Sequence, residues 1–310
     1  MKTLKPRVAY EGSLRKPRGY SLHQTFQAYS LPWMYDGSRA YMELCSGSIA
    51  VLEEHGDEIT YRVYVVEGSR CWEQEVESIP EAIGLREDYT ELHRLCASDP
   101  LLSCIPRSIP GYRLRRLTVW QAILVAVCQQ NASFKQGWTM LYNIYVKTGR
   151  RVRLGEHTYI ATPEPGKLTL EVLREARLGY RARTVMEIVS KGLWRLDCSS
   201  VEDLREARGV GDYTLNLVKL LACRDYDSLP VDRWLRALAS EAYRVNPRSV
   251  ENELTRRFNG WRGLAALLTT IAFDAEPLRR ALERLKRGEN CPGKTHPSPL
   301  TLWRYLPKPS

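Results

Sequence analysis

The sequence has little of what would place it in a membrane, on a secretory route or around a metal. It has no apolar run of membrane-spanning length, and no secretory segment precedes the fold. Its eight cysteines form no C-x-x-C pair and no close group of four, which argues against a zinc site or an iron–sulfur cluster. It also contains no internal repeat. These absences predict a soluble globular protein of the cytoplasm that contacts no membrane.

The cysteines raise a question about their redox state. Cys96 and Cys104 are close enough in sequence to form a disulfide. Buried thiols, however, normally stay reduced in the cytoplasm. We therefore expect reduced cysteines.

The charge balance is basic. The 310 residues include 46 lysines and arginines against 36 aspartates and glutamates, a formal net charge of +10. Basic residues gather in the runs 2–18, 113–116 and 147–153, although a single run of this kind is usually solvated surface. The excess favours a polyanionic partner. A ribosome-associated protein or a merely basic enzyme would show the same excess.

The N-terminal part of the chain divides into an arm and a sheet. Residues 1–19 form a basic arm of irregular pattern, which we expect to be disordered or loosely docked. Residues 20–88 are predicted to form an antiparallel β-sheet domain. This prediction rests on the β-branched and alternating apolar residues at 40–44, 48–52 and 60–66, which are separated by glycine-containing turns.

The remainder of the chain has a helical pattern. From Pro80 to about Arg287 the apolar residues recur with a helical period, so residues 89–290 are predicted to form a helical core. The proline-rich residues 291–310 form a C-terminal extension that we expect to wrap over the surface. The predicted fold class is therefore α+β, a sheet domain followed by an all-α core.

A short glycine hairpin, Gly209-Val210-Gly211, is the most informative local motif. It lies between helix-patterned runs at 201–207 and 213–222. Two glycines around one apolar residue make a tight turn whose free backbone N–H groups can approach a phosphate closely. The motif predicts a contact with a phosphate backbone.

An aspartate follows the hairpin at a fixed distance. Asp232 comes 21 residues after Gly211, directly after Pro230-Val231, and opens the helix-patterned run 233–243. At a helix N-cap the backbone dipole favours an ionised carboxylate. An isolated aspartate at this place is usually only a cap, and its position one helix after the glycine hairpin is what makes it a candidate for chemistry.

Hairpin and aspartate together resemble the helix–hairpin–helix DNA glycosylase superfamily, and the resemblance extends over about residues 20–290. Within that superfamily the chain is most similar to the 8-oxoguanine DNA glycosylases. Residues 178–183 are close to their wedge segment, and Cys128 to Asn131 falls where they have a cysteine-to-asparagine turn. The resemblance implies a helical core of two lobes, an enzyme that removes a damaged base, and double-stranded DNA as partner.

The resemblance also implies roles for single residues. Asp232 is similar to the catalytic aspartate of the family. Gly209, Val210 and Gly211 are similar to its phosphate-binding hairpin, whose backbone often binds a sodium or potassium ion. The resemblance implies no side-chain metal ligands. Three further residues resemble groups that act at the flipped nucleotide: Asn131 as the plug of the vacated stack, Tyr180 as the wedge beside the opposite base, and Arg181 as a contact to that base. Outside this family, a helix-cap asparagine and a half-buried core tyrosine would be the default interpretation of Asn131 and Tyr180.

Three departures separate the chain from the 8-oxoguanine enzymes. They have a nucleophilic lysine two residues after the second hairpin glycine, where this sequence has Tyr213, which cannot form an imine. The segment from Tyr213 to Asn216 and the pair Gln129-Gln130 are instead similar to the alkylpurine glycosylases, which do not cleave the strand. Gln136 stands where an arginine reads the cytosine opposite the lesion.

The base pocket is predicted from aromatic residues, each of which could equally be core. The candidates are Trp33, Tyr29, Phe134, Trp234, Phe273 and Tyr213.

We therefore expect a monomeric, nucleoid-associated DNA N-glycosylase that hydrolyses the bond to an oxidised or alkylated purine with Asp232 and without redox or organic cofactor. One alternative is a glycosylase with strand-cleaving lyase activity from another lysine, such as Lys135 or Lys219. A second alternative is a non-catalytic DNA-binding module, since glycine hairpins also serve as phosphate clamps.

Overall fold

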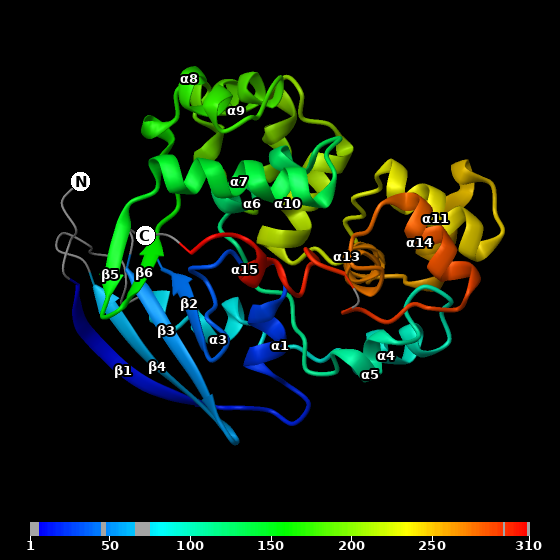
Figure 1. The fold of residues 1–310 in the computed structure, drawn as a ribbon, viewed down its shortest axis with the longest axis horizontal. Coiled ribbons are helices and arrows are strands. Elements are labelled where there is room, and N and C mark those ends of the chain that lie inside the picture. The colour runs from blue at the N-terminus through cyan, green and yellow to red at the C-terminus, as the bar shows by residue number, and fades with distance from the viewer. Residues whose placement is uncertain (1–5, 45–47, 66–74, 294, 309–310) are drawn as a thin grey trace.

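The computed structural model describes residues 6–44, 48–65, 75–293 and 295–308 (Figure 1). An antiparallel sheet of order β1-β4-β3-β2 occupies the N-terminal part. Its strands are β1 (Arg7–Arg15), β2 (Arg39–Glu43), β3 (Ile49–His55) and β4 (Glu58–Val65). The three predicted strands are thereby confirmed, while the predicted turn at Ser46-Gly47 and the final strand residue Val66 lie outside the described residues.

Strand β1 corrects the prediction of a disordered basic arm. Arg7 pairs with Val65 and Arg15 pairs with Glu58, so residues 7–15 of the arm form an edge strand along the whole of β4. Most β1 side chains are exposed, as expected of an edge strand with one side open to water. In the sequence such a strand looks like a solvated basic segment, because its pairing partner lies about fifty residues away.

The inner face of the sheet packs against short helices and the C-terminal extension. Ile59, Tyr61, Val63 and Val65 alternate inward along β4. They share a core with helices α1 (Leu22–Gln27) and α3 (Ile79–Ala82) and with Trp303 of α15 (Leu302–Tyr305).

The first helical lobe is built around α6 (Val119–Gln129), which is buried from Ala122 to Cys128. Thr118 and Gln121 form a capping box that starts this helix, as the sequence predicts. Helices α7, α9 and α10 pack around α6. The helices of this lobe are α7 (Phe134–Thr148), α8 (Leu170–Glu175), α9 (Arg181–Ser190), η3 (Leu193–Arg195), η4 (Val201–Glu206) and α10 (Asp212–Cys223).

The second lobe brings distant parts of the chain together (Figure 1). Its helices are α4 (Thr90–Ala97), α5 (Ile105–Ser108), α11 (Arg233–Tyr243), α12 (Val250–Arg257), α13 (Arg262–Ala272) and α14 (Leu278–Lys286). Asp99, after α4, is paired with Arg257 of α12 at 3.5 Å. The two predicted helical lobes are thus confirmed.

A two-stranded hairpin interrupts the helical part and corrects the prediction of an all-α pattern from Pro80 to about Arg287. Strands β5 (Arg151–Leu154) and β6 (His157–Ile160) pair with each other. The His157 ring stacks on Tyr41 of β2 with 3.7 Å between centroids. The backbone N–H of Thr162 donates to Glu43 at 2.7 Å. The hairpin therefore joins the helical part to the sheet domain.

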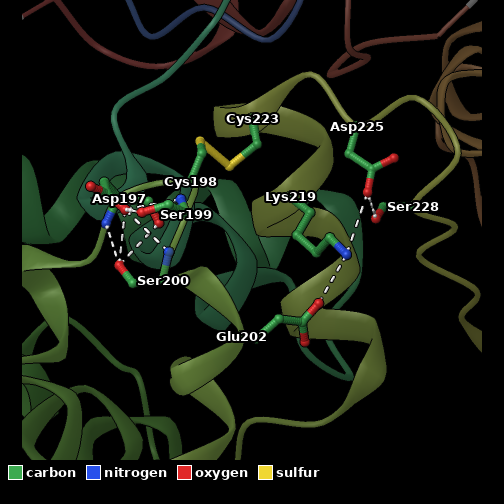
Figure 2. The surroundings of a disulfide bond; sticks show 9 residues. All are labelled: Asp197, Cys198, Ser199, Ser200, Glu202, Lys219, Cys223, Asp225 and Ser228. Atoms are coloured by element: carbon green, nitrogen blue, oxygen red, sulfur yellow. Dashed lines mark hydrogen bonds and ion pairs between the residues drawn. A yellow bond between two sulfur atoms is a disulfide. The ribbon is translucent and has the colours of Figure 1, made fainter.

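Two disulfides among the described residues correct the prediction of reduced thiols. Cys104 of the α5 region is bonded to Cys291, and Cys198 is bonded to Cys223 at the end of α10 (Figure 2). Cys96 does not pair with Cys104; it is a free thiol within the core, as is Cys128. Both disulfides join elements that only the folded chain brings together, so spacing alone could not reveal them.

Over the described residues, no helix is both long and apolar enough to cross a lipid bilayer.

Candidate active site

A cavity of about 670 Å³ opens between the two helical lobes. Its walls come from α7 and α10 of the first lobe, from α11 and α13 of the second, and from the C-terminal extension. The lining residues include Tyr29, Gln129, Phe134, Lys135, Trp138, Tyr213, Asp232, Trp234, Glu276 and His296. A cavity of this size has room for a single nucleobase with water.

Asp232 lies in the wall of this cavity at the N-cap of α11. Its Oδ1 accepts the backbone N–H of Leu235 at 2.7 Å, which is the expected capping bond. The side chain of Asp232 is exposed to solvent, although protein atoms surround much of its carboxylate. This burial raises the pKa of Asp232, and hydrogen bonds from the backbone of Leu235 and Trp234 partly oppose the rise. The structure therefore holds a carboxylate, open to a ligand, in a largely enclosed place.

Tyr213, in the first turn of α10, lines the same cavity. Burial, and then the nearby charge of Asp232, raise the pKa of its phenol above the usual value. The phenol is therefore neutral across the physiological range. The phenol lines the cavity and can form hydrogen bonds. It stands at the position where the resemblance to the 8-oxoguanine enzymes would predict a lysine.

Aromatic rings form another part of the cavity wall. Tyr29 stacks on Trp138 with 5.9 Å between centroids, and Phe134 lies 6.4 Å from Tyr29. Trp234 also lines the cavity, and its indole N–H donates to the carbonyl of Glu276 at 2.8 Å. The structure brings together four predicted pocket residues with Asp232. It adds Trp138, whose place one turn after Phe134 on α7 was a usable signal.

Two predicted pocket residues are not in the cavity. Trp33 is fully buried and packs its ring against Tyr142 and Tyr145. Phe273 is also fully buried, with the guanidinium of Arg284 over its ring. The hydrophobic character of these two side chains does not indicate whether they face a pocket or the core, and in the fold both face the core. We therefore remove Trp33 and Phe273 from the candidate pocket.

The structure separates the two alternative lysines. Lys135 lines the cavity, with its amine 5.4 Å from the centre of the Tyr305 ring. Lys219 instead pairs with Glu202 at 3.0 Å and with Asp225 at 3.4 Å, next to the Cys198–Cys223 disulfide (Figure 2). Its pairing with Glu202 raises the pKa of Lys219, which keeps its amine protonated. Lys219 is not a suitable nucleophile.

Arg115 is a cavity residue that sequence reasoning missed, because it lies within a basic run interpreted as surface. Its guanidinium turns inward and donates to the carbonyl of Ala28 at 3.0 Å and of Tyr29 at 3.3 Å. Burial lowers the pKa of Arg115 to about 10. These bonds fix the backbone of Tyr29, which adopts a left-handed φ of 52°.

The structure gives different reasons for glycine at the two hairpin positions. Gly209 has a φ of +89°, and a Cβ placed there would come within 2.4 Å of the Thr184 hydroxyl. Gly211 has an extended φ of −116°, and a Cβ there would meet nothing within 4 Å. The fold therefore requires glycine at 209. At 211 it leaves open space before the first N–H groups of α10. Val210 between them is half-buried against the core.

Asn131 and Tyr180 come together although 49 residues separate them. The Asn131 amide donates to the Tyr180 hydroxyl at 3.2 Å. Both side chains are exposed, and 57% of Tyr180 is accessible to solvent. Tyr180 is therefore not the half-buried core tyrosine of the default interpretation, whereas Asn131, with a left-handed φ of 44°, directly follows the C-cap of α6 and still fits the default of a helix-end asparagine. They form one polar and aromatic projection, which we call the wedge pair.

Arg181 does not face outward as predicted. Its guanidinium is buried and donates through Nε to the backbone carbonyl of Gln130 at 2.8 Å. The same group lies 4.6 Å from the centre of the Tyr180 ring. Arg181 therefore packs against the ring of Tyr180 and stabilises the wedge pair. It is no longer a candidate contact to a base.

Gln136 is an exposed capping residue. Its side-chain oxygen accepts the N–H of Ser133 at 3.1 Å and so completes the capping box of α7. Among the described residues, no three histidine, cysteine, aspartate or glutamate side chains gather closely enough to hold a metal ion. The cation predicted at the hairpin backbone stays a prediction.

The fold has clear counterparts among solved structures. The chain aligns over 92% of its length with 98% of the Clostridium acetobutylicum 8-oxoguanine glycosylase/lyase bound to double-stranded DNA, at 17% identity and a TM-score of 0.65. It aligns over 89% of its length with 98% of the 3-methyladenine DNA glycosylase from Archaeoglobus fulgidus, at 18% identity and a TM-score of 0.66. No family model matches the sequence, and no curated protein sequence matches it. The chain therefore shares the overall fold of these two solved proteins.

Proposed function

We propose that the protein is a DNA N-glycosylase that hydrolyses the bond between deoxyribose and a flipped-out damaged purine. The observation that carries this proposal is the carboxylate of Asp232 in the wall of an aromatic cavity, one helix after a glycine hairpin. Structures of the same fold are named for the removal of 8-oxoguanine and 3-methyladenine. An oxidised or an alkylated purine would fit equally well between the cavity's rings.

The chemistry assigned to Asp232 follows from charge. As the C1′–N bond breaks, its electron pair leaves with the base and positive charge builds on the sugar. An ionised carboxylate beside the sugar stabilises that charge and orients a water molecule. The water oxygen bonds to C1′, and the proton that the water loses passes by way of the carboxylate to solvent. A base that leaves as an anion takes up a proton from solvent, whereas a base alkylated to a cation leaves neutral. Partial burial strengthens the interaction, because little water competes for the carboxylate.

The remaining groups hold the DNA in the reactive arrangement. The open space at Gly211 lets a phosphate approach the first N–H groups of α10. Asn131 and Tyr180 project far enough to fill the gap that a flipped nucleotide leaves. Tyr29, Phe134 and the other cavity rings would then stack on the extruded base.

We assign a reaction without strand cleavage, because Tyr213 has no amine to form an imine with the sugar. The alternative is a lyase activity through Lys135, the lysine that lines the cavity within the described part of the chain. A non-catalytic clamp would need the hairpin alone and would leave the cavity and Asp232 without a purpose.

The test is a panel of duplexes that each contain one lesion, with 8-oxoguanine, 3-methyladenine and related bases among them. Release of free base is measured directly, and strand breaks are measured with and without alkali. We expect base release from at least one purine lesion and breaks only after alkali. Tight binding without release from any duplex would favour the clamp.

A further inference from the structure

The hairpin and the wedge pair are tied together by one buried glutamine. Gln130 is the C-cap of α6 and is 9% exposed. Its amide nitrogen donates to the carbonyl of Gly209 at 2.7 Å and to the hydroxyl of Thr214 at 2.5 Å. Both hydrogens of the amide are thereby used, one on the hairpin and one on the first turn of α10.

The backbone of the same residue supports the wedge pair. The Gln130 carbonyl accepts two N–H groups of the Arg181 guanidinium, which is itself 8% exposed. Arg181 lies against the Tyr180 ring, and Asn131, the next residue after Gln130, bonds to the Tyr180 hydroxyl. Asn131 adopts a left-handed φ of 44°, so its orientation depends on what fixes its neighbours.

The residues of this network are not among those that line the cavity. It joins the group that would hold a phosphate to the groups that would fill the vacated stack. Hydrogen bonds among buried groups fix relative positions strongly, because a broken bond leaves an unsatisfied polar atom in the core.

We propose that Gln130 is a positioning residue that couples the hairpin to the wedge pair, so that phosphate capture sets the wedge pair for insertion. This inference rests on the proposed function. It predicts that loss of the Gln130 amide harms recognition of a disrupted stack more than binding to intact duplex.

The experiment compares equilibrium binding to two duplexes, one undamaged and one with a tetrahydrofuran abasic analogue. Four proteins are measured: the unaltered chain, Gln130→Met, Asn131→Ala and the double variant. Methionine keeps the side-chain volume and removes both donated bonds. Gln130→Glu replaces it if the methionine variant does not fold, since the carboxylate cannot donate to Gly209.

Gln121→Met is the matched control. Gln121 lies at the other end of α6, where its side chain caps the helix and donates to Thr162 at 2.8 Å. Its replacement also removes two side-chain bonds. It should lower the melting temperature to a similar degree and leave the preference for the abasic duplex unchanged.

We expect Gln130→Met to reduce the preference for the abasic duplex by about tenfold, and Asn131→Ala to cost less than about threefold more in that background. An unchanged preference, or losses that multiply independently in the double variant, would overturn the coupling. Loss of affinity to the same degree on both duplexes would mark Gln130 as a merely structural residue. If the unaltered protein shows no preference at all, the proposed function fails with it.

Discussion

Replacing Asp232 with asparagine separates the structural task of this residue from its chemical one. The side-chain oxygen that accepts the Leu235 N–H at 2.7 Å is present in both side chains, and asparagine caps a helix as well as aspartate does. The charge is removed. We therefore expect Asp232→Asn to keep its fold and its affinity for DNA while its base release in a single turnover falls by a hundredfold or more. A hundredfold loss corresponds to about 2.7 kcal/mol of transition-state stabilisation.

The stability of this variant has a predictable sign. Burial raises the pKa of Asp232 in the folded chain, so ionisation at neutral pH opposes folding. The asparagine variant is free of that cost and should melt at the same temperature as the unaltered protein or higher. This gain should disappear once the pH falls below the usual pKa of aspartate, where the carboxyl is neutral in both states. Asp232→Ala is free of the same cost but also loses the cap, about 1 kcal/mol, and should melt about 2 °C lower than the asparagine variant.

The assay is single-turnover release of a lesion base, together with thermal melting and DNA binding of the three proteins. Base release by Asp232→Asn within about threefold of the unaltered rate would refute the assignment of Asp232. Equal melting losses for the asparagine and alanine variants would refute the argument from the cap.

Three further outcomes follow from the site. Gly211→Val should fold normally and lose affinity for every duplex, whereas Gly209→Val should lower the melting temperature. Unchanged DNA affinity of a folded Gly211→Val protein would show that the open space at 211 is not a phosphate site. Borohydride should trap little or no covalent protein–DNA adduct, because Tyr213 replaces an amine, and efficient trapping that disappears in Lys135→Met would establish a lyase instead. The rate of base release should fall on the acid side at a higher pH than an ordinary aspartate would give, because the ionised form of Asp232 is the active one and its pKa is raised; an acid limb at the usual aspartate value would contradict this.

Local signals in the sequence were sufficient for the hairpin, the capping box at Thr118 and the N-cap at Asp232. Each depends on residues within four positions of one another, so the chain needs no tertiary partner to reveal them. The same holds for the three predicted strands, whose alternation is a property of each segment by itself.

Side-chain direction could not be predicted in the same way. The resemblance assigned an outward role to Arg181, and residue type assigned pocket-facing roles to Trp33 and Phe273; the fold turns all three into the interior. Arg181 shows why: what holds its guanidinium is the carbonyl of a residue 51 positions earlier, which no local pattern contains. Arg115 shows the opposite error, since a basic run taken as surface contains a buried arginine that supports the cavity.

The Cys104–Cys291 disulfide turns most of the helical part into a covalent ring. The two cysteines are 187 positions apart, and the smaller ring closed by Cys198 and Cys223 lies inside it. A protease that cuts once between 104 and 198 therefore leaves two peptides joined by one link, and a cut between 198 and 223 leaves them joined by two. Such nicked protein would run as one band on a gel until a reductant separates the peptides. In the oxidised protein, residues 104–291 therefore form one covalent loop that contains a second, smaller loop.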